Sequence, residues 1–174
     1  MMKPLAAVLI IFLLASSAGC SSGSNKAAAT QPARSTTINV STGAATMERA
    51  ARSALSENRR LSIHVLWNNR IPSWAQRSTR GPALASLRAA AKNRQSRGIR
   101  VRILKSRRQV ITLRMDPSYT RATAVVLDRQ RVQPSQPNGH PIGRPVVLNE
   151  RARYELRRVG ESDRFVVWRV VLLR

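Results

Sequence analysis

The chain has 174 residues, which is enough for one ordinary domain with short tails. It carries 31 Lys and Arg against 8 Asp and Glu, a net charge of +23, so its surface favours anionic over cationic partners. The single cysteine excludes an intramolecular disulfide. Arginine outnumbers lysine 27 to 4, a usage typical of GC-rich genomes, so genomic bias is an alternative to an evolved binding surface.

Residues 1–19 have the pattern of an export signal. Lys3 precedes an apolar run that ends at Ala15, and small residues follow up to Cys20. The run is shorter than the roughly 20 apolar residues that a membrane-spanning helix needs. Residues 18–20, Ala-Gly-Cys, resemble a lipobox, although Ser17 stands where leucine is usual. The resemblance implies that Cys20 is diacylated, for instance with palmitate, and anchors the chain to the outer face of a bacterial cell membrane.

Residues 20–44 are rich in Ser, Thr, Ala and Gly and contain few large apolar side chains. Such a composition cannot build a core, so this range is predicted to be a flexible tether. The folded domain is expected at residues 45–174.

Two helices are expected to begin the folded domain. Residues 45–69 place apolar side chains three or four positions apart, and Pro72 breaks the pattern. Gly81 and Pro82 mark the start of a second helix, for which Gly98 is a natural stop.

From Ile99 the apolar spacing switches to two residues, which indicates β-strands. Strand segments are expected at 99–103, 111–115, 121–132, 144–159 and 165–173. Ser106–Arg108 is interpreted as an interruption of the first strand, Asp116–Ser118 as a turn, and residues 133–143 as a long polar loop. Two helices followed by about four antiparallel strands predict an α+β domain, with a curved, cone-like sheet folded over the helices.

The end of the chain carries Tyr154, Leu156, Gly160 and Trp168 within two apolar strand patterns. This ending resembles that of the cone-shaped nuclear-transport-factor-like (SnoaL-like) superfamily, over residues 45–174. The resemblance is to its non-catalytic branch, typified by the plastid-division intermembrane-space domain and by actinobacterial exported lipoproteins, and it implies a binding or assembly role. Other branches are small-molecule isomerases, dehydratases and hydrolases, whose catalytic members use an Asp–His or Asp–Arg pair inside the cone.

Few residues are candidates for catalysis. His64 lies in a predicted helix and His140 in the polar loop, settings that favour packed or solvated roles. Asp116 and Asp128 are interpreted as turn or ion-pair residues, with Asp128 at the end of a strand. No His/Cys cluster has zinc-site spacing, so neither a metal nor a cofactor is expected. The sequence thus assigns no catalytic residue and favours a non-enzymatic role, without deciding against an enzyme.

Basic residues alternate with apolar ones in two predicted strands, which would place the basic set in solvent. The predicted binding surface comprises Arg100, Arg102, Arg151, Arg153 and Arg157. Its expected partner at the cell envelope is an anionic lipid, a cell-wall polymer or an acidic protein. Because few aromatic residues are available for base stacking, nucleic acid is not favoured.

The alternative function is small-molecule binding or catalysis in a pocket near Trp67, Trp74 and Glu150. The two tryptophans flank the predicted helix break and could line the mouth of a cone, although such residues more often close a core. Glu150 shares a face with Leu148 and Tyr154. A carboxylate on a core-facing side would be buried and would need a partner, most easily an arginine.

The lipobox pattern generates a direct test. Cys20→Ala removes the thiol that is acylated, so we expect the variant to accumulate as precursor or to be released into the medium. Metabolic labelling with a radioactive fatty acid, followed by membrane fractionation, measures this. A mature, acyl-labelled Cys20→Ala protein in the membrane would contradict the assignment.

Overall fold

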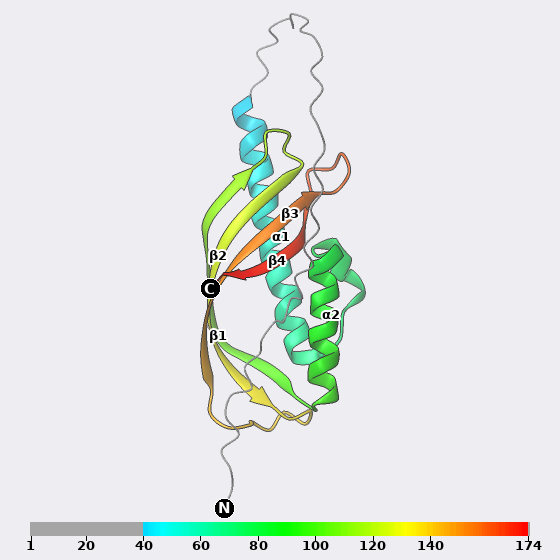
Figure 1. Cartoon of the computed structure of the whole chain (residues 1–174), viewed down its shortest axis with the longest axis vertical. Coiled ribbons are helices and arrows are strands. Elements are labelled where there is room, and N and C mark those ends of the chain that lie inside the picture. Colours follow the sequence, from blue (N-terminus) through cyan, green and yellow to red (C-terminus); the bar gives the residue numbers. More distant parts are fainter. Residues whose placement is uncertain (1–39, 174) are drawn as a thin grey trace, which may run out of the picture.

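The computed structural model describes residues 40–173, with side chains from residue 43 onward (Figure 1). The helices are α1 (Val40–Asn68), the 3-10 helix η1 (Ser73–Arg77) and α2 (Gly81–Ser96). The strands are β1 (Arg100–Met115), β2 (Arg121–Ser135), β3 (Val146–Arg158) and β4 (Phe165–Leu173). The predicted α+β class is confirmed. The predicted signal segment and Cys20 lie outside the described residues.

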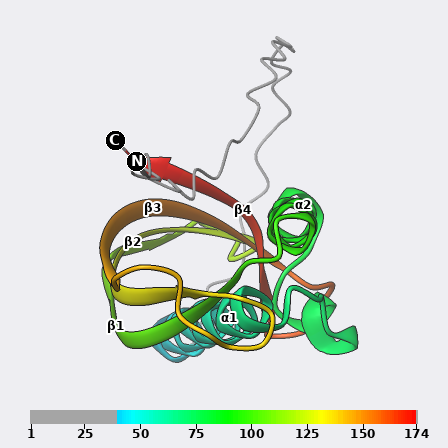
Figure 2. The same cartoon turned by 90° about the horizontal axis from the view of Figure 1, so that it is seen from below.

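The four strands form one antiparallel sheet in the order β1-β2-β3-β4. Figure 2 shows that the sheet curls around the helices, which lie on its concave side. Helix α1 packs against the two edge strands, β1 and β4, and α2 packs against β4. The concave face of the sheet is therefore covered by helices, whereas no described helix covers the convex face.

Helix α1 begins at Val40, within the range assigned to the tether, and it ends where the sequence predicts a break. The next residue, Asn69, has a φ of 52°, in the left-handed region that asparagine tolerates. Its backbone N–H donates to the Val65 carbonyl at 3.0 Å, and its side-chain amide donates to the Ile99 carbonyl at 2.7 Å. Asn69 thus stops the helix and ties its end to the start of β1.

Strand β1 differs from the prediction in two ways. It runs without interruption through Ser106–Arg108, and it contains register shifts at Leu104 and Ile111. A bulge inserts one extra residue, so the inward face is resumed by Ser106 and Arg108. The second bulge leaves Ile111 45 % exposed, while Leu113 packs against the core. The predicted strand at 111–115 is therefore confirmed, but Ile111 does not share the inward face of Leu113 and Met115.

The core has two parts. One lies between α1 and the concave face of the sheet and is centred on Leu55, Val126, Tyr154, Leu156 and Val167. The other lies between α1, η1 and α2 and includes Leu61, Val65, Leu84 and Leu87. Burying each large apolar side chain stabilises the fold by about 1.5–3 kcal/mol. The buried core residues begin at Ala51, and the partly buried Met47 and Ala50 pack against them, so a chain that starts at Ser21 contains both parts of the core.

The start of α2 supplies a test of packing. Gly81 and Gly160 have left-handed φ values of 55° and 57°. A Cβ at Gly81 would lie 2.8–2.9 Å from ring atoms of Trp168, whereas nothing lies within 4 Å of a Cβ at Gly160. Gly160→Ala should therefore cost about 1 kcal/mol of backbone strain, and Gly81→Ala about 1–3 kcal/mol more for the overlap with the ring. Urea denaturation measures both, and equal losses would mean that Trp168 does not pack on this turn.

Candidate functional site

The convex face of the sheet carries a dense set of basic side chains. Antiparallel partners point to the same side of a sheet, so the strand register gives the composition of this face. We call the following exposed residues the outer basic face: Arg102, Lys105, Arg107, Arg114, Arg121, Arg129, Arg131, Arg151, Arg153 and Arg157. None of them forms an ion pair with another described residue. Glu155 is the one carboxylate that the described strands place there.

Four of the five arginines singled out from the sequence belong to the outer basic face, where Arg102 is separate from the group of Arg151, Arg153 and Arg157; Arg100 is half-buried and does not belong to it. Arg102 lies opposite Gln133 near one end of β2, whereas Arg153 lies opposite Val125. Eight residues of β2 separate the two positions (133 − 125 = 8), which is roughly 26 Å at about 3.3 Å per residue. Arg102 is therefore not in contact with that group. Basic residues that the sequence reasoning did not select occupy the interval, so the positive face is continuous.

Two of the five arginines also make contacts with aromatic rings. Arg100 is half-buried, and its guanidinium carbon lies 5.8 Å from the centre of the Trp67 ring. Arg157 is exposed, with its guanidinium carbon 4.0 Å above the Trp168 ring. Both are within the range of a cation–π interaction. These two arginines therefore contribute to packing as well as to surface charge.

A cavity lies on the opposite, concave side of the sheet. Its volume is about 130 Å³, and its walls come from α1, α2 and all four strands. Most of the lining is apolar, including Leu66, Leu87, Val132, Leu148, Val170 and Leu172. Polar groups on Arg108, Asp128 and Glu150 also reach it. An apolar cleft with a few convergent polar groups is the usual form of a small-molecule site.

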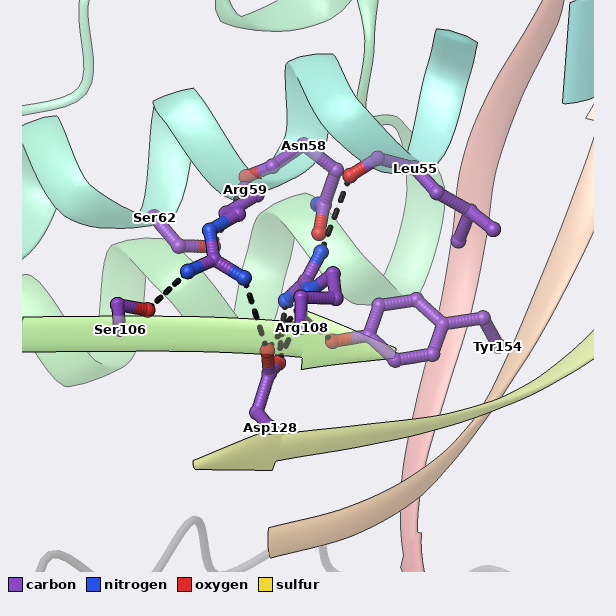
Figure 3. Close-up of polar contacts among 8 residues, drawn as sticks. All are labelled: Leu55, Asn58, Arg59, Ser62, Ser106, Arg108, Asp128 and Tyr154. Carbon is purple, nitrogen blue, oxygen red and sulfur yellow. Dashed lines mark hydrogen bonds and ion pairs between the residues drawn. The ribbon is translucent and has the colours of Figure 1, made fainter. Parts of the chain in front are cut away.

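Asp128 is the centre of the polar cluster at this cavity (Figure 3). It lies in the middle of β2, not at the strand end that the sequence reasoning assigned to it, and it is 7 % exposed. Arg108 of β1 donates to both carboxylate oxygens, from Nε at 2.9 and 3.0 Å and from Nη2 at 2.5 Å. Arg59 of α1 donates from Nη1 at 3.2 Å, and its Nη2 donates to the Ser106 hydroxyl.

Arg108 has further partners in two more elements. Its Nη1 donates to the Leu55 carbonyl at 3.0 Å and its Nη2 to the Tyr154 hydroxyl at 3.1 Å. Burial acts to lower the pKa of Arg108, but hydrogen bonds and charge from Asp128 and Tyr154 outweigh it and raise that pKa. Burial raises the pKa of Tyr154, so its phenol stays protonated at neutral pH. The cluster thus joins α1, β1, β2 and β3 through charge-assisted hydrogen bonds.

Glu150 lies beside this cluster without joining it. It is opposite Asp128 in the β2–β3 register, and it lines the cavity with Leu148 and Tyr154, the two residues with which it was expected to share a face. Burial, and then the nearby Asp128 charge, raise its pKa. The sequence predicted an arginine partner for a buried Glu150, but the two arginines nearby, Arg59 and Arg108, pair with Asp128 instead. Glu150 forms no hydrogen bond or ion pair with another described residue.

The tryptophans assigned to a pocket with Glu150 lie elsewhere. Neither Trp67 nor Trp74 is part of the cavity wall. Trp67 contacts Arg100, and Trp74 contacts His64 edge to face, with ring centres 5.9 Å apart. His140 is exposed in the loop after β2. No group of three or more His, Cys, Asp or Glu that could hold a metal is found within residues 40–173.

Arg59 and Arg108 are site residues that the sequence reasoning missed. The sequence pattern placed Arg108 in an interruption of the first strand, and it placed Arg59 within the predicted helix at 45–69 without singling it out. A continuous β1 with one bulge would have placed Arg108 on the inward face, opposite Asp128 in the register. A lone carboxylate that faces inward from β2 needs a cation as its partner. This requirement is the one feature of the sequence that could have indicated the Arg108–Asp128 pair.

Comparisons with known proteins support the fold alone. No protein-family model matches this chain, and no curated protein matches it in sequence. The crystal structure of the intermembrane space region of the chloroplast protein ARC6 is similar, with a TM-score of 0.58 and 15 % sequence identity. The match covers 72 % of this chain and 95 % of that one. Within the described residues, none of the helices has the length and apolar character to span a membrane.

The Asp128 cluster predicts a large difference between two ion pairs. Asp128→Asn leaves two arginines without their anion in a buried setting, which should destabilise the fold by about 3–5 kcal/mol. Asp163→Asn removes the partner of Arg158 at 3.0 Å, but the Asp163 side chain is 59 % exposed, so the loss should be about 1 kcal/mol or less. Thermal and urea unfolding of both variants measure the difference. Similar losses would show that Asp128 is not the buried centre of the cluster.

Proposed function

We propose that this chain is an exported lipoprotein whose α+β domain binds an anionic phospholipid surface through its outer basic face. The observation that carries the proposal is a sheet face on which the described strands place many exposed cations and a single carboxylate, Glu155. The role is one of binding at the cell envelope and needs no catalytic residue.

The spacing of the basic residues suits a membrane surface. Neighbouring positions on one side of an antiparallel sheet lie about 5–7 Å apart, within the screening length of about 8 Å at physiological ionic strength. The potentials of adjacent arginines therefore add. Each basic residue near an anionic bilayer contributes about 1 kcal/mol of attraction, so a few of them suffice for stable recruitment.

The predicted anchor supports the same location. A diacylated Cys20 would hold the domain near the bilayer, and tethering raises the effective concentration of a binding face at its target. A basic face adds a second signal to the lipid chains. It would fix which side of the domain meets the surface, leaving the helical side and the cavity turned toward the aqueous phase.

A vesicle flotation assay with the chain from Ser21 to Arg174 tests this face. The native chain should float with vesicles that contain anionic phospholipid and stay in solution with purely zwitterionic ones. Replacing Arg129, Arg151 and Arg153 with Gln should weaken binding by about 3 kcal/mol, or roughly 100-fold, and added salt should weaken the native chain. These three side chains are exposed and form no hydrogen bond or ion pair with other described residues, so the fold is expected to survive.

The matched control replaces three exposed helix arginines, Arg49, Arg60 and Arg88, with Gln. This variant has the same net charge as the strand variant but keeps the outer basic face. It should bind vesicles nearly as well as the native chain. Equal losses in the two triple variants would leave only a diffuse charge effect and would contradict a specific face. Binding to an anionic wall polymer without binding to vesicles would reassign the partner.

A further inference from the structure

The cavity on the concave side is independent of the outer basic face and has the size of a small-molecule site. Its roughly 130 Å³ compares with the about 150 Å³ of an apolar cavity that accommodates benzene. One aromatic or aliphatic ring with a short substituent would fill it. The wall from Leu66, Leu148 and Leu172 is apolar, so a ligand of this size would bury most of its surface against hydrocarbon.

The polar groups of the cavity differ in how many of their hydrogen-bonding positions have partners. The Arg108 guanidinium has acceptors on Asp128, Leu55 and Tyr154, and the Asp128 carboxylate receives donors from two arginines. These groups satisfy one another and leave little for a ligand. Glu150 shares the cavity wall and receives no donor from any described residue.

Two further cations line the cavity and could favour a ligand of the opposite charge. Arg94 of α2 is 8 % exposed, and it donates from Nε to the Asn69 side-chain oxygen at 3.0 Å and from Nη2 to the Val65 carbonyl at 3.2 Å. Arg169 of β4 lies opposite Glu155 of the convex face in the strand register and is exposed to solvent. Arg94 thus has two acceptors and Arg169 has water. Among the charged groups of the cavity, Glu150 is the one that has no partner among the described residues and is also partly removed from water.

We infer that the cavity binds a small apolar amine, whose ring lies against the leucine-lined wall and whose ammonium group donates to the Glu150 carboxylate. A protonated primary amine supplies the donors that Glu150 lacks, and the charge-assisted bond forms in a partly water-excluded site. Transfer of the ligand's apolar ring from water to the leucine-lined wall contributes favourable free energy. Glu150 selects a cation over an anion of the same shape.

Benzylamine, benzyl alcohol and benzoate are suitable probes because they share one ring and differ in charge. Each would be titrated into the chain from Ser21 to Arg174 and followed by amide chemical shifts in NMR spectra. Benzylamine should bind at least tenfold more tightly than benzyl alcohol, with the largest shifts in β3 and in the facing part of α1. Benzoate should bind more weakly than both.

Glu150→Gln keeps the shape of the side chain and removes its charge, so it should reduce benzylamine affinity at least tenfold while leaving benzyl alcohol unchanged. Glu155→Gln, on the opposite face of the same strand, is the matched control and should bind benzylamine as the native chain does. Unchanged amine binding in Glu150→Gln would overturn the inference. Preferential binding of benzoate that is lost in Arg94→Gln would overturn it too, and so would the absence of binding by all three probes.

Discussion

A carboxylate in the middle of a covered sheet must be paired, because an uncompensated buried charge costs several kcal/mol. Asp128 meets this constraint with arginines from two different elements, Arg108 of the adjacent strand and Arg59 of α1. Arg108 then extends the network to the Leu55 carbonyl and the Tyr154 hydroxyl. The position of α1 over the sheet, and with it the shape of the cavity beneath, depends on this set of charge-assisted bonds.

The sheet separates two chemistries by the alternation of its side chains. Its concave face is apolar around the Asp128 cluster and is covered by helices, whereas its convex face is basic and exposed. On β3 the two faces are interleaved residue by residue: Ala152 and Tyr154 are buried, while Arg151 and Arg153 are exposed. The convex, charged face and the cavity on the concave side can therefore serve different partners without competing for the same residues.

The proposed functions make different demands on the fold. Binding to a lipid surface uses many weak, additive charge interactions, so no single arginine of the outer basic face is expected to dominate. Binding of a small amine uses one partly buried carboxylate and a fitted apolar wall, so a single substitution at Glu150 decides it. The domain in this proposal faces the membrane with its convex side and offers its cavity toward the aqueous phase.

The sequence determined the class of fold and most element boundaries, because periodicities of 3.6 and 2 residues and the turn signals are local. Strand β4 and the start of β2 were predicted at the residues observed, and the inward and outward sets of β3 followed from alternation. The tertiary structure alone decided the site. Two bulges in β1 turn Arg108 inward and Ile111 outward, and the long-range register places Asp128 beside Glu150. A bulge depends on how a strand curves around its core, and that curvature is set by distant residues that no local pattern records.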